Sequence, residues 1–328
     1  MHVIIPVAGE GTRLRPHTYS IPKVLLPVAG KPILSHILDE VVKLSPSKVT
    51  LIIGHLGDKI KSYLQSNYDL HFNWIVQEQR RGLGHAVGMG ITEDDREPLL
   101  IILGDTIFEA DLSSVGEGGV SSIGVKEVED PRRFGVVQLK GDRVVKMIEK
   151  PEVPPSNLAI VGLYYITDAG KLAGAVNRLI DEDIQTKGEY QLTDALQLLV
   201  EGGETLKTFK VDGWYDCGKP ETLLETNAHF LSKQSAGSDN TENCIVGPVF
   251  LSPESSVRHS VIGPYVSISG RVTVERSVIR NSVLCEGAVV RDIVLEDSII
   301  GPGAIVEGTT SSLNLGELSQ VKFGRISE

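Results

Sequence analysis

Residues 3–16 read Val-Ile-Ile-Pro-Val-Ala-Gly-Glu-Gly-Thr-Arg-Leu-Arg-Pro, an apolar run that leads into a glycine-rich turn. Its apolar first half is typical of a buried strand, and Gly9 and Gly11 let backbone amides approach a phosphate without hindrance from a Cβ atom. Arg13 adds a planar, permanently charged donor that suits a polyphosphate. No Gly-Lys-Ser/Thr follows, and Leu14 stands where a dinucleotide fingerprint has its third glycine. The stretch therefore predicts a phosphate-binding turn after the first strand of an α/β sheet.

Strand-like and helix-like patterns alternate over the first two-thirds of the chain. Apolar runs at residues 49–53 and 99–103 each end at a glycine, and the apolar residues of 34–42 have helical spacing. Residues 135–148 predict a hairpin that turns at Lys140-Gly141-Asp142. Further helical patterns cover residues 172–180, 192–200 and 221–231. Continuous apolar strands separated by helices predict a Rossmann-like, mostly parallel sheet that is covered on both faces.

The pattern changes after residue 232. Residues 234–243 are rich in Ser, Asn and Gly, which is typical of a linker. Beyond them, short aliphatic segments recur every five or six residues with small residues between, as in Ser260-Val261-Ile262 and Ser277-Val278-Ile279. This pattern resembles the hexapeptide repeat of a left-handed parallel β-helix, in which stacking buries the face that one coil leaves open. An ordinary antiparallel sandwich is the alternative.

These patterns divide the chain into three parts. A first domain covers residues 1–233, a linker covers 234–243, and a β-helix domain covers 244–328. Residues 315–328 lack the aliphatic repeat, and we expect them to cap or pad the last coil.

Composition narrows the classes of function. The 328 residues include 32 basic and 43 acidic side chains, and the net charge of −11 argues against a nucleic-acid binder. Three cysteines are too few for a disulfide scaffold and odd in number, which favours a reducing cytoplasm. The N-terminal apolar run is too short for a signal peptide, and no apolar stretch approaches the roughly 18 residues that span a bilayer.

Further motifs follow the glycine-rich turn in order along the chain. They are Pro22-Lys23-Val24-Leu25-Leu26-Pro27, Gly82-Leu83-Gly84-His85-Ala86, Leu103-Gly104-Asp105, Arg133-Phe134-Gly135-Val136, Glu149-Lys150-Pro151, Gly188-Glu189 and Trp214-Tyr215-Asp216-Cys217-Gly218. With these motifs the chain resembles the sugar-1-phosphate nucleotidyltransferases. The resemblance is strongest to the longer glucose-1-phosphate thymidylyltransferases with an appended β-helix, and the uridylyltransferases are almost as similar. It implies transfer of a nucleotidyl group from dTTP or UTP to a sugar 1-phosphate, with glucose 1-phosphate favoured.

The resemblance implies three catalytic residues, Arg13, Lys23 and Asp105. A sugar-phosphate oxygen attacks the α-phosphorus and pyrophosphate leaves, so positioning and charge neutralisation dominate the chemistry. Arg13 and Lys23 would neutralise the phosphates. Asp105 and Asp216 are the implied ligands of Mg²⁺, the implied cofactor, because a hard carboxylate suits an ion that bridges phosphate oxygens. The simpler alternatives are a solvated lysine at position 23 and ordinary turn aspartates.

The resemblance also implies residues for each substrate. The nucleotide-binding set is Ala8, Gly9, Gly11, Thr12, Gln77 and Gly82, and the sugar-phosphate-binding set is Gly135, Glu149, Lys150, Gly162 and Lys187. The amide of Gln77 offers a donor and an acceptor, which match the O4 and N3–H of thymine or uracil. Lys187 stands where the thymidylyltransferases usually have arginine, and Glu10 replaces a glycine of their pattern. A carboxylate beside a triphosphate is unfavourable unless it points away.

Three alternative functions stay open. One is a regulatory or scaffolding subunit with a degenerate site, and another is an enzyme of the same family for GTP or for a different sugar. The third is a bifunctional enzyme whose β-helix is an acyltransferase, but that region contains a single histidine, His259. We expect the β-helix to assemble a homo-oligomer, a dimer or a tetramer, and we expect no nucleic-acid or membrane partner.

Overall fold

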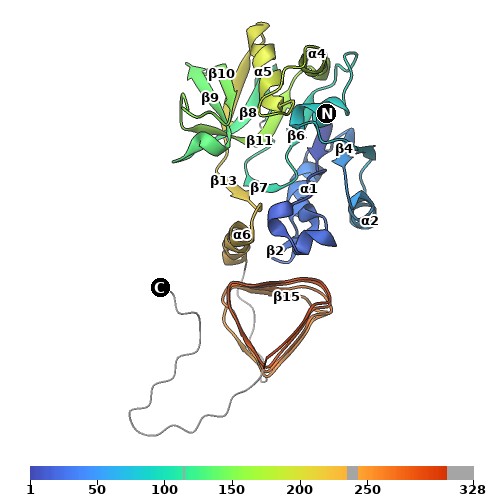
Figure 1. Ribbon diagram of the computed structural model, residues 1–328, viewed down its shortest axis with the longest axis vertical. Coiled ribbons are helices and arrows are strands. Elements are labelled where there is room, and N and C mark those ends of the chain that lie inside the picture. Colours follow the sequence, from blue (N-terminus) through green and yellow to red (C-terminus); the bar gives the residue numbers. More distant parts are fainter. Residues whose placement is uncertain (114, 235–242, 309–328) are drawn as a thin grey trace. The chain divides into compact units, whose positions relative to one another are not determined.

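The computed structural model describes residues 1–113, 115–234 and 243–308. The chain divides into two compact units, Met1–Ser235 (unit 1) and Ala236–Glu328 (unit 2) (Figure 1). Most of the expected linker at 234–243, and the expected cap at 315–328, lie outside the described residues. Among the helices of the described part, none combines the length and the apolar character needed to cross a membrane.

A nine-stranded mixed sheet forms the centre of unit 1. Its strands, in spatial order, are β5 (Phe72–Val76), β4 (Lys48–Ile53), β1 (His2–Pro6), β6 (Leu99–Ile102), β11 (Leu158–Ile166), β8 (Ser121–Glu127), β12 (Leu206–Lys210), β10 (Arg143–Glu149) and β9 (Gly135–Lys140). From β5 to β6 all neighbours are parallel, and β11 then runs antiparallel to both β6 and β8. Strand β12 is parallel to β8, whereas β10 is antiparallel to β12 and to β9. The parallel half is the Rossmann-like part that the sequence predicts.

Helices cover both faces of this sheet. The α-helices of the described residues are α1 (Ile33–Lys43), α2 (Gly57–Asn67), α3 (Leu83–Gly88), α4 (Ala169–Asp181), α5 (Leu192–Glu201) and α6 (Pro220–Ser232). Successive side chains of a strand point to opposite faces. Val3 and Ile5 of β1 accordingly pack in a core with α1 and α2, while Ile4 packs with α3, α4 and α5. Full burial of each such side chain contributes about 1.5–3 kcal/mol.

The elements that the sequence predicts in unit 1 are confirmed within a few residues. The expected helices are α1, α4, α5 and α6, and the hairpin is formed by β9 and β10. Its turn contains Gly141 at φ +66°, a conformation that glycine adopts without strain.

The carboxyl ends of the parallel strands meet at one edge of the sheet, above which a crevice is expected. Glycines allow the chain segments to approach closely there. A Cβ atom on Gly54, after β4, would lie 2.8 Å from the carbonyl oxygen of Ala8, and one on Gly104 would lie 2.4 Å from a methyl of Val7. Two strands outside the main sheet, β7 (Thr106–Glu109) and β13 (Gly213–Asp216), form an antiparallel ribbon beside this edge.

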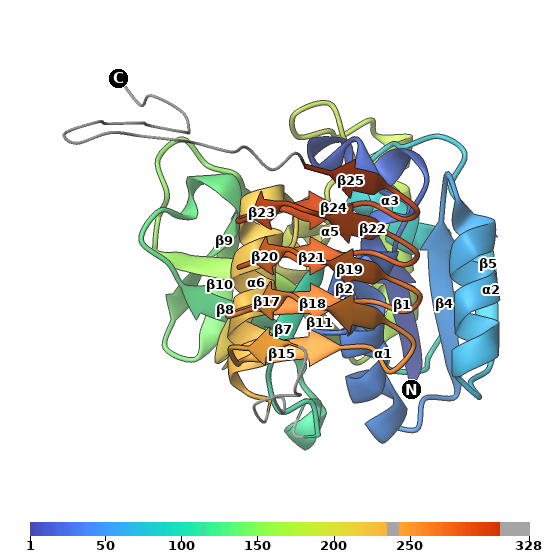
Figure 2. The same ribbon diagram turned by 90° about the horizontal axis from the view of Figure 1, so that it is seen from below.

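Unit 2 consists, in its described part, of three parallel ladders of four strands each. The ladders are β14 (Cys244–Ile245), β17 (Val261–Ile262), β20 (Val278–Ile279) and β23 (Val294–Leu295); β15 (Val249–Leu251), β18 (Val266–Ile268), β21 (Val283–Leu284) and β24 (Ile299–Ile300); and β16 (Ser256–Arg258), β19 (Thr273–Glu275), β22 (Val289–Arg291) and β25 (Ile305–Glu307). Figure 1 shows the triangular outline of the coils and Figure 2 their stacking. These stacked parallel strands confirm the left-handed β-helix, and their parallel pairing excludes the antiparallel sandwich.

Each coil takes 16 or 17 residues, since Val261 pairs with Val278 and Val283 with Ile299. Each side of the triangle therefore takes five or six residues, which is the spacing of the aliphatic segments in the sequence. Serines at a corner of the triangle link successive coils by hydrogen bonds. The backbone amide of Ser277 donates to Oγ of Ser260 at 3.1 Å. Aliphatic side chains fill the interior, and opposite charges align outside, as where Arg291 and Glu307 lie 2.9 Å apart.

Candidate active site

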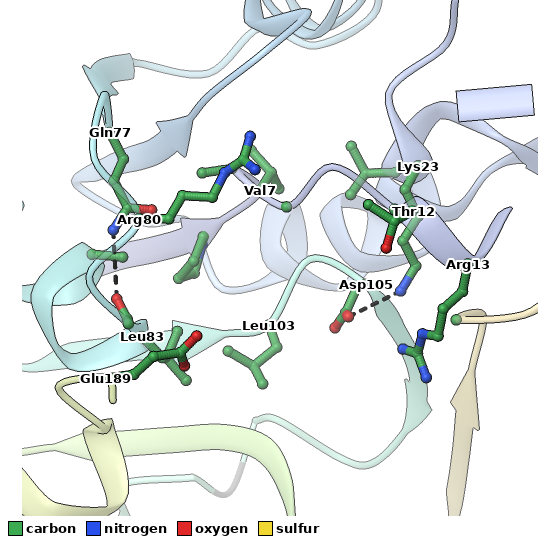
Figure 3. Close-up of a pocket in the computed structure, with 18 residues that line it drawn as sticks. Val7, Thr12, Arg13, Lys23, Gln77, Arg80, Leu83, Leu103, Asp105 and Glu189 are labelled. Atoms are coloured by element: carbon green, nitrogen blue, oxygen red, sulfur yellow. Dashed lines mark hydrogen bonds and ion pairs between the residues drawn. The ribbon is translucent and has the colours of Figure 1, made fainter. Parts of the chain in front are cut away.

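Two adjoining cavities open at the carboxyl edge of the parallel strands. The first has a volume of about 400 Å³ and the second about 620 Å³. The residues that line both are Arg13, Leu83, Leu103, Asp105 and Glu189. Figure 3 shows the first cavity, with Arg13 and the contact between Lys23 and Asp105 at one end and Gln77 and Arg80 at the other. Two compartments therefore meet at a charged junction.

The glycine turn, residues 8–12, contributes Ala8, Gly9, Gly11 and Thr12 to the wall of the first cavity. Gly11 has φ +63°, and a Cβ atom there would lie 3.0 Å from Cβ of Lys23, so both conformation and space require glycine. A Cβ atom on Gly9 would meet nothing within 4 Å, because this residue faces open space. Thr18 braces the turn by donating its hydroxyl to the carbonyl of Gly11 at 2.8 Å.

Lys23 and Asp105 form an ion pair at the junction. Lys23 is 7% exposed, and its Nζ donates to Oδ2 of Asp105 at 2.9 Å. Burial alone would raise the pKa of Asp105, but the ammonium of Lys23 and the hydroxyl of Thr106 hold it below the ordinary value. The carboxylate of Asp105 is therefore ionised at neutral pH. The alternative of a solvated lysine at position 23 is wrong, because the side chain is buried.

Asp216 lines the second cavity from strand β13 of the β7–β13 ribbon. In the ladder it pairs with Thr106, next to Asp105, so the ribbon brings together two aspartates that are distant in sequence. A Cβ atom on Gly218 would lie 2.6 Å from Nη2 of Arg13 and 2.7 Å from Oδ1 of Asp216. This glycine therefore lets the guanidinium and the carboxylate approach the chain closely.

Two carboxylates alone do not complete a metal site. Within the part of the chain that the structure describes, no three His, Cys, Asp or Glu side chains are grouped to hold an ion. Asp105 and Asp216 nevertheless fit Mg²⁺, which typically binds one or two carboxylates and takes its other ligands from waters and substrate phosphates.

Gln77 lies at the opposite end of the first cavity and is 7% exposed. Its Nε2 lies 3.2 Å from Nδ1 of His85 and donates weakly to the carbonyl of Gly82 at 3.5 Å. Burial, with the charge of Arg81, lowers the pKa of His85, which favours a neutral ring that accepts the amide hydrogen. The amide oxygen of Gln77 has no partner among the residues described, so it is available as an acceptor.

Gly82 shapes the same wall. It has φ +111°, and a Cβ atom would lie 2.5 Å from the carbonyl oxygen of Tyr190. The segments are joined by backbone hydrogen bonds, from Tyr190 to Arg81 and from Gly84 to Tyr190, both of 2.8 Å. A larger residue at position 82 would separate them.

The second cavity is lined by Glu149 and Lys150 together with two close-packed glycines. Glu149 accepts a hydrogen bond of 2.8 Å from the hydroxyl of Thr193, and its other oxygen lies 3.1 Å from Nζ of Lys150. A Cβ atom on Gly135 would lie 3.1 Å from the Glu149 carboxylate. Gly162 has φ +83°, and a Cβ atom there would lie 2.8 Å from the side chain of Leu103. The wall of the second cavity thus presents the oriented carboxylate of Glu149 and the ammonium of Lys150.

Lys187 is the one expected site residue that lines neither cavity. It is exposed, and its Nζ donates to the backbone carbonyl of Lys150 at 3.1 Å. It therefore contacts the chain behind Lys150 rather than the cavity itself.

Several lining residues were not predicted as site residues. They include Arg80, Leu83, Arg133, Tyr164, Glu189, Thr193, Trp214 and Lys219. Most stand within or next to the motifs named above, which is the signal that identifies them in retrospect. Trp214 packs edge-on against Phe134 with ring centroids 4.6 Å apart, and so joins two of those motifs.

Glu10 is accommodated by two arginines. Its carboxylate lies 2.6 Å from Arg80 and 2.9 Å from Arg15. Arg15 also lies 5.0 Å from the ring centroid of Tyr19, so it braces the turn instead of lining either cavity. The unfavourable charge that the sequence suggests at position 10 is thus neutralised within the protein.

Comparisons with known proteins agree with this geometry. Residues 2–233 match the model of the family described as "Nucleotidyl transferase". The chain is 31% identical to a low-salt glycan biosynthesis nucleotidyltransferase of Haloferax volcanii, over 98% of this chain and all of that protein. It is 28% identical to a glucose-1-phosphate thymidylyltransferase of Streptomyces antibioticus, over 98% of this chain and 99% of that one. A crystal structure of UDP-glucose pyrophosphorylase with UDP-glucose superposes with a TM-score of 0.61 at 27% identity, covering 71% of this chain and 99% of the other.

Proposed function

The chain belongs to the nucleotidyl transferase family, and from this we propose that it transfers a nucleotidyl group from dTTP or UTP to a sugar 1-phosphate, releasing pyrophosphate. Glucose 1-phosphate is the favoured acceptor, because a thymidylyltransferase and a UDP-glucose pyrophosphorylase that act on glucose derivatives resemble the chain. One observation carries the proposal: two cavities of different character meet at Arg13 and Asp105. Such a junction suits a reaction between two bound phosphate compounds.

The first cavity is proposed to bind the nucleotide. Ala8, Gly9, Gly11 and Thr12 would offer backbone donors to the phosphates. Gln77 would face the pyrimidine edge with its free amide oxygen, and Gly82 would lie against the nucleoside. Arg13 and Lys23 would neutralise the triphosphate as the α-phosphorus is attacked, which is the main requirement of phosphoryl chemistry.

The second cavity is proposed to bind the sugar phosphate. Glu149 would accept hydrogen bonds from sugar hydroxyls, oriented by Thr193, and Gly135 and Gly162 would let the ring approach the backbone. Lys150 would pair with the phosphate. Lys187 is proposed to support it through the contact with the carbonyl of Lys150.

Members of the family generally use a divalent metal, and Mg²⁺ is the proposed ion here. Asp105 and Asp216 would hold it, and when bound it would offset the repulsion between two phosphate groups. Lys23 shares the carboxylate of Asp105 and would keep it oriented.

Unit 2 is proposed to assemble the protein into a dimer or tetramer through the flank or end of its coils. Three free thiols, of which Cys217 and Cys285 are buried, support the proposed cytoplasmic location. A chain ending at residue 235 should keep transferase chemistry and lose assembly. Sedimentation of the full chain as a monomer at micromolar concentration would overturn the assembly role.

The test of the proposed function is a pyrophosphate-release assay that crosses four nucleoside triphosphates with several sugar 1-phosphates. We expect turnover with dTTP or UTP to exceed that with ATP or GTP. A preference for GTP would point to a guanylyltransferase, and no turnover with any pair would favour a regulatory subunit. Arg178→Gln, which removes an exposed ion pair between Arg178 of α4 and Glu182 just after this helix, is the matched control.

A further inference from the structure

Glu10 and Arg80 form an ion pair between two loops that border the first cavity. The glycine turn follows β1, whereas residues 77–82, which we call the base loop, follow β5. In the sheet β4 lies between these two strands, so the loops must bridge the end of β4 to meet. Among the salt bridges of the described residues, the 2.6 Å contact of Glu10 Oε1 with Arg80 Nη1 is the only one that joins the two loops.

The carboxylate of Glu10 is also held from its own side. Its second oxygen lies 2.9 Å from Nη2 of Arg15, whose guanidinium stacks on Tyr19. The hydrogen bond and charge of Arg80 lower the pKa of Glu10, so the carboxylate is ionised at neutral pH. One anion thus connects a guanidinium fixed to the glycine turn with a guanidinium of the base loop.

Arg80 lines the cavity, and Glu10 does not. Figure 3 shows Arg80 on the side of Gln77, away from Arg13 and the Lys23–Asp105 pair. Its guanidinium is held by Glu10, and it lies at the end of the cavity where the base is proposed to bind. This placement suits a group that sets the spacing of two loops better than one that neutralises phosphates.

We propose that the Glu10–Arg80 pair is a latch that holds the glycine turn and the base loop at the spacing a bound nucleoside requires. Glu10 is then a positioning residue that strengthens nucleotide binding in spite of its negative charge. The identity of the ligand rests on the proposed function, whereas the connection of the two loops does not. Charge repulsion alone predicts the opposite effect on nucleotide affinity, because removing a carboxylate near a triphosphate should lower the Kd.

The test is a double-mutant cycle in the full chain with Glu10→Gln, Arg80→Gln and the double variant, and with Arg178→Gln as the control. Calorimetry measures the Kd of dTTP and UTP in the absence of sugar phosphate, and steady-state assays give kcat and KM. Hydrogen exchange of the nucleotide-free protein reports residues 8–13 and 78–82. This last measurement examines the latch independently of any ligand.

We expect each single variant to raise Kd and KM about two- to fivefold, the range of a half-exposed ion pair, with kcat unchanged. The double variant should be no worse than the worse single one, and Glu10→Gln should speed exchange in the base loop. Equal or tighter binding by Glu10→Gln, or additive losses, would overturn the latch. If exchange shows the coupling while the unaltered protein binds neither triphosphate, the latch stands and the proposed pyrimidine substrate fails.

Discussion

Asp105→Asn is the substitution that most directly examines the junction of the two cavities. Asparagine keeps the size of the side chain and removes its charge, so the shape of the site is preserved. The Lys23 ammonium loses its anionic partner, and so would the proposed Mg²⁺. We expect kcat to fall at least about tenfold, which corresponds to about 1.4 kcal/mol of barrier. Binding of the triphosphate to the glycine turn should be less affected.

The stability effect follows from the ion pair. Unit charges 2.9 Å apart attract by about 6 kcal/mol at an effective dielectric constant of about 20. The desolvation of Lys23, whose side chain is 8% exposed, cancels much of this attraction. Water also weakens it by screening the Asp105 side chain, which is 49% exposed. We therefore expect Asp105→Asn to lower the free energy of unfolding by about 1–2 kcal/mol at pH 7. Because the pKa of Asp105 is lowered in the folded state, its contribution is present above the unfolded pKa of about 3.9 and is lost as the pH falls through the folded value.

Urea unfolding monitored by tryptophan fluorescence measures this effect, since both tryptophans, Trp74 and Trp214, lie in unit 1. The decisive comparison is the double variant Lys23→Met/Asp105→Asn. Removing the buried, unpaired ammonium should restore stability relative to Asp105→Asn, while activity stays low. A double variant less stable than Asp105→Asn, or full activity in the single variant, would refute this reasoning.

Three further substitutions examine the rest of the site. Gly11→Ala should lower the free energy of unfolding by about 1–2 kcal/mol, because residue 11 has a left-handed backbone conformation. Gly9 faces open space, so Gly9→Ala should raise the KM for the triphosphate and leave the protein folded. Equal destabilisation by the two substitutions would contradict this. Gln77→Ala should raise the KM for dTTP or UTP more than it lowers kcat, since base contacts are similar in the ground and transition states, and a larger effect on kcat would count against base recognition. Asp216→Asn should lower kcat at least about tenfold, and its combination with Asp105→Asn should be little worse than the worse single variant. Multiplicative losses, or full activity in EDTA, would show that no metal is shared.

The parallel half of the sheet and the β-helix could be predicted because their signals are local. An apolar run followed by glycine marks three of the parallel strands, β1, β4 and β6, whereas β5 contains Asn73 and is followed by Gln77. The repeated aliphatic pairs mark each side of a coil. Strand β11 is different, because residues 158–166 are paired with strands from residues 99–102 and 121–127. Such long-range antiparallel pairing leaves no local pattern, so the mixed character of the sheet appears only in the structure.

The site residues divide in the same way. Arg13, Lys23 and Asp105 stand in motifs with a recognisable order, and the structure brings them together. The direction of a long side chain on a loop depends on its neighbours, so the contact of Lys187 with a backbone carbonyl could not be read from the sequence. The pairing of Arg80 with Glu10 likewise depends on the sheet order that places their loops opposite each other.

The coil length of unit 2 restricts how this part of the chain can change during evolution. Removing residues 261–277, one complete coil, would bring Val278 into the place of Val261 and keep the register of the remaining strands. Deleting a single residue within a strand would instead turn the next buried aliphatic side chain outward. A difference of one residue at a corner is accommodated, since coils of 17 and 16 residues stack on each other. Insertions and deletions are therefore tolerated here in whole coils, and homologous chains should differ in length by multiples of 16 or 17 residues.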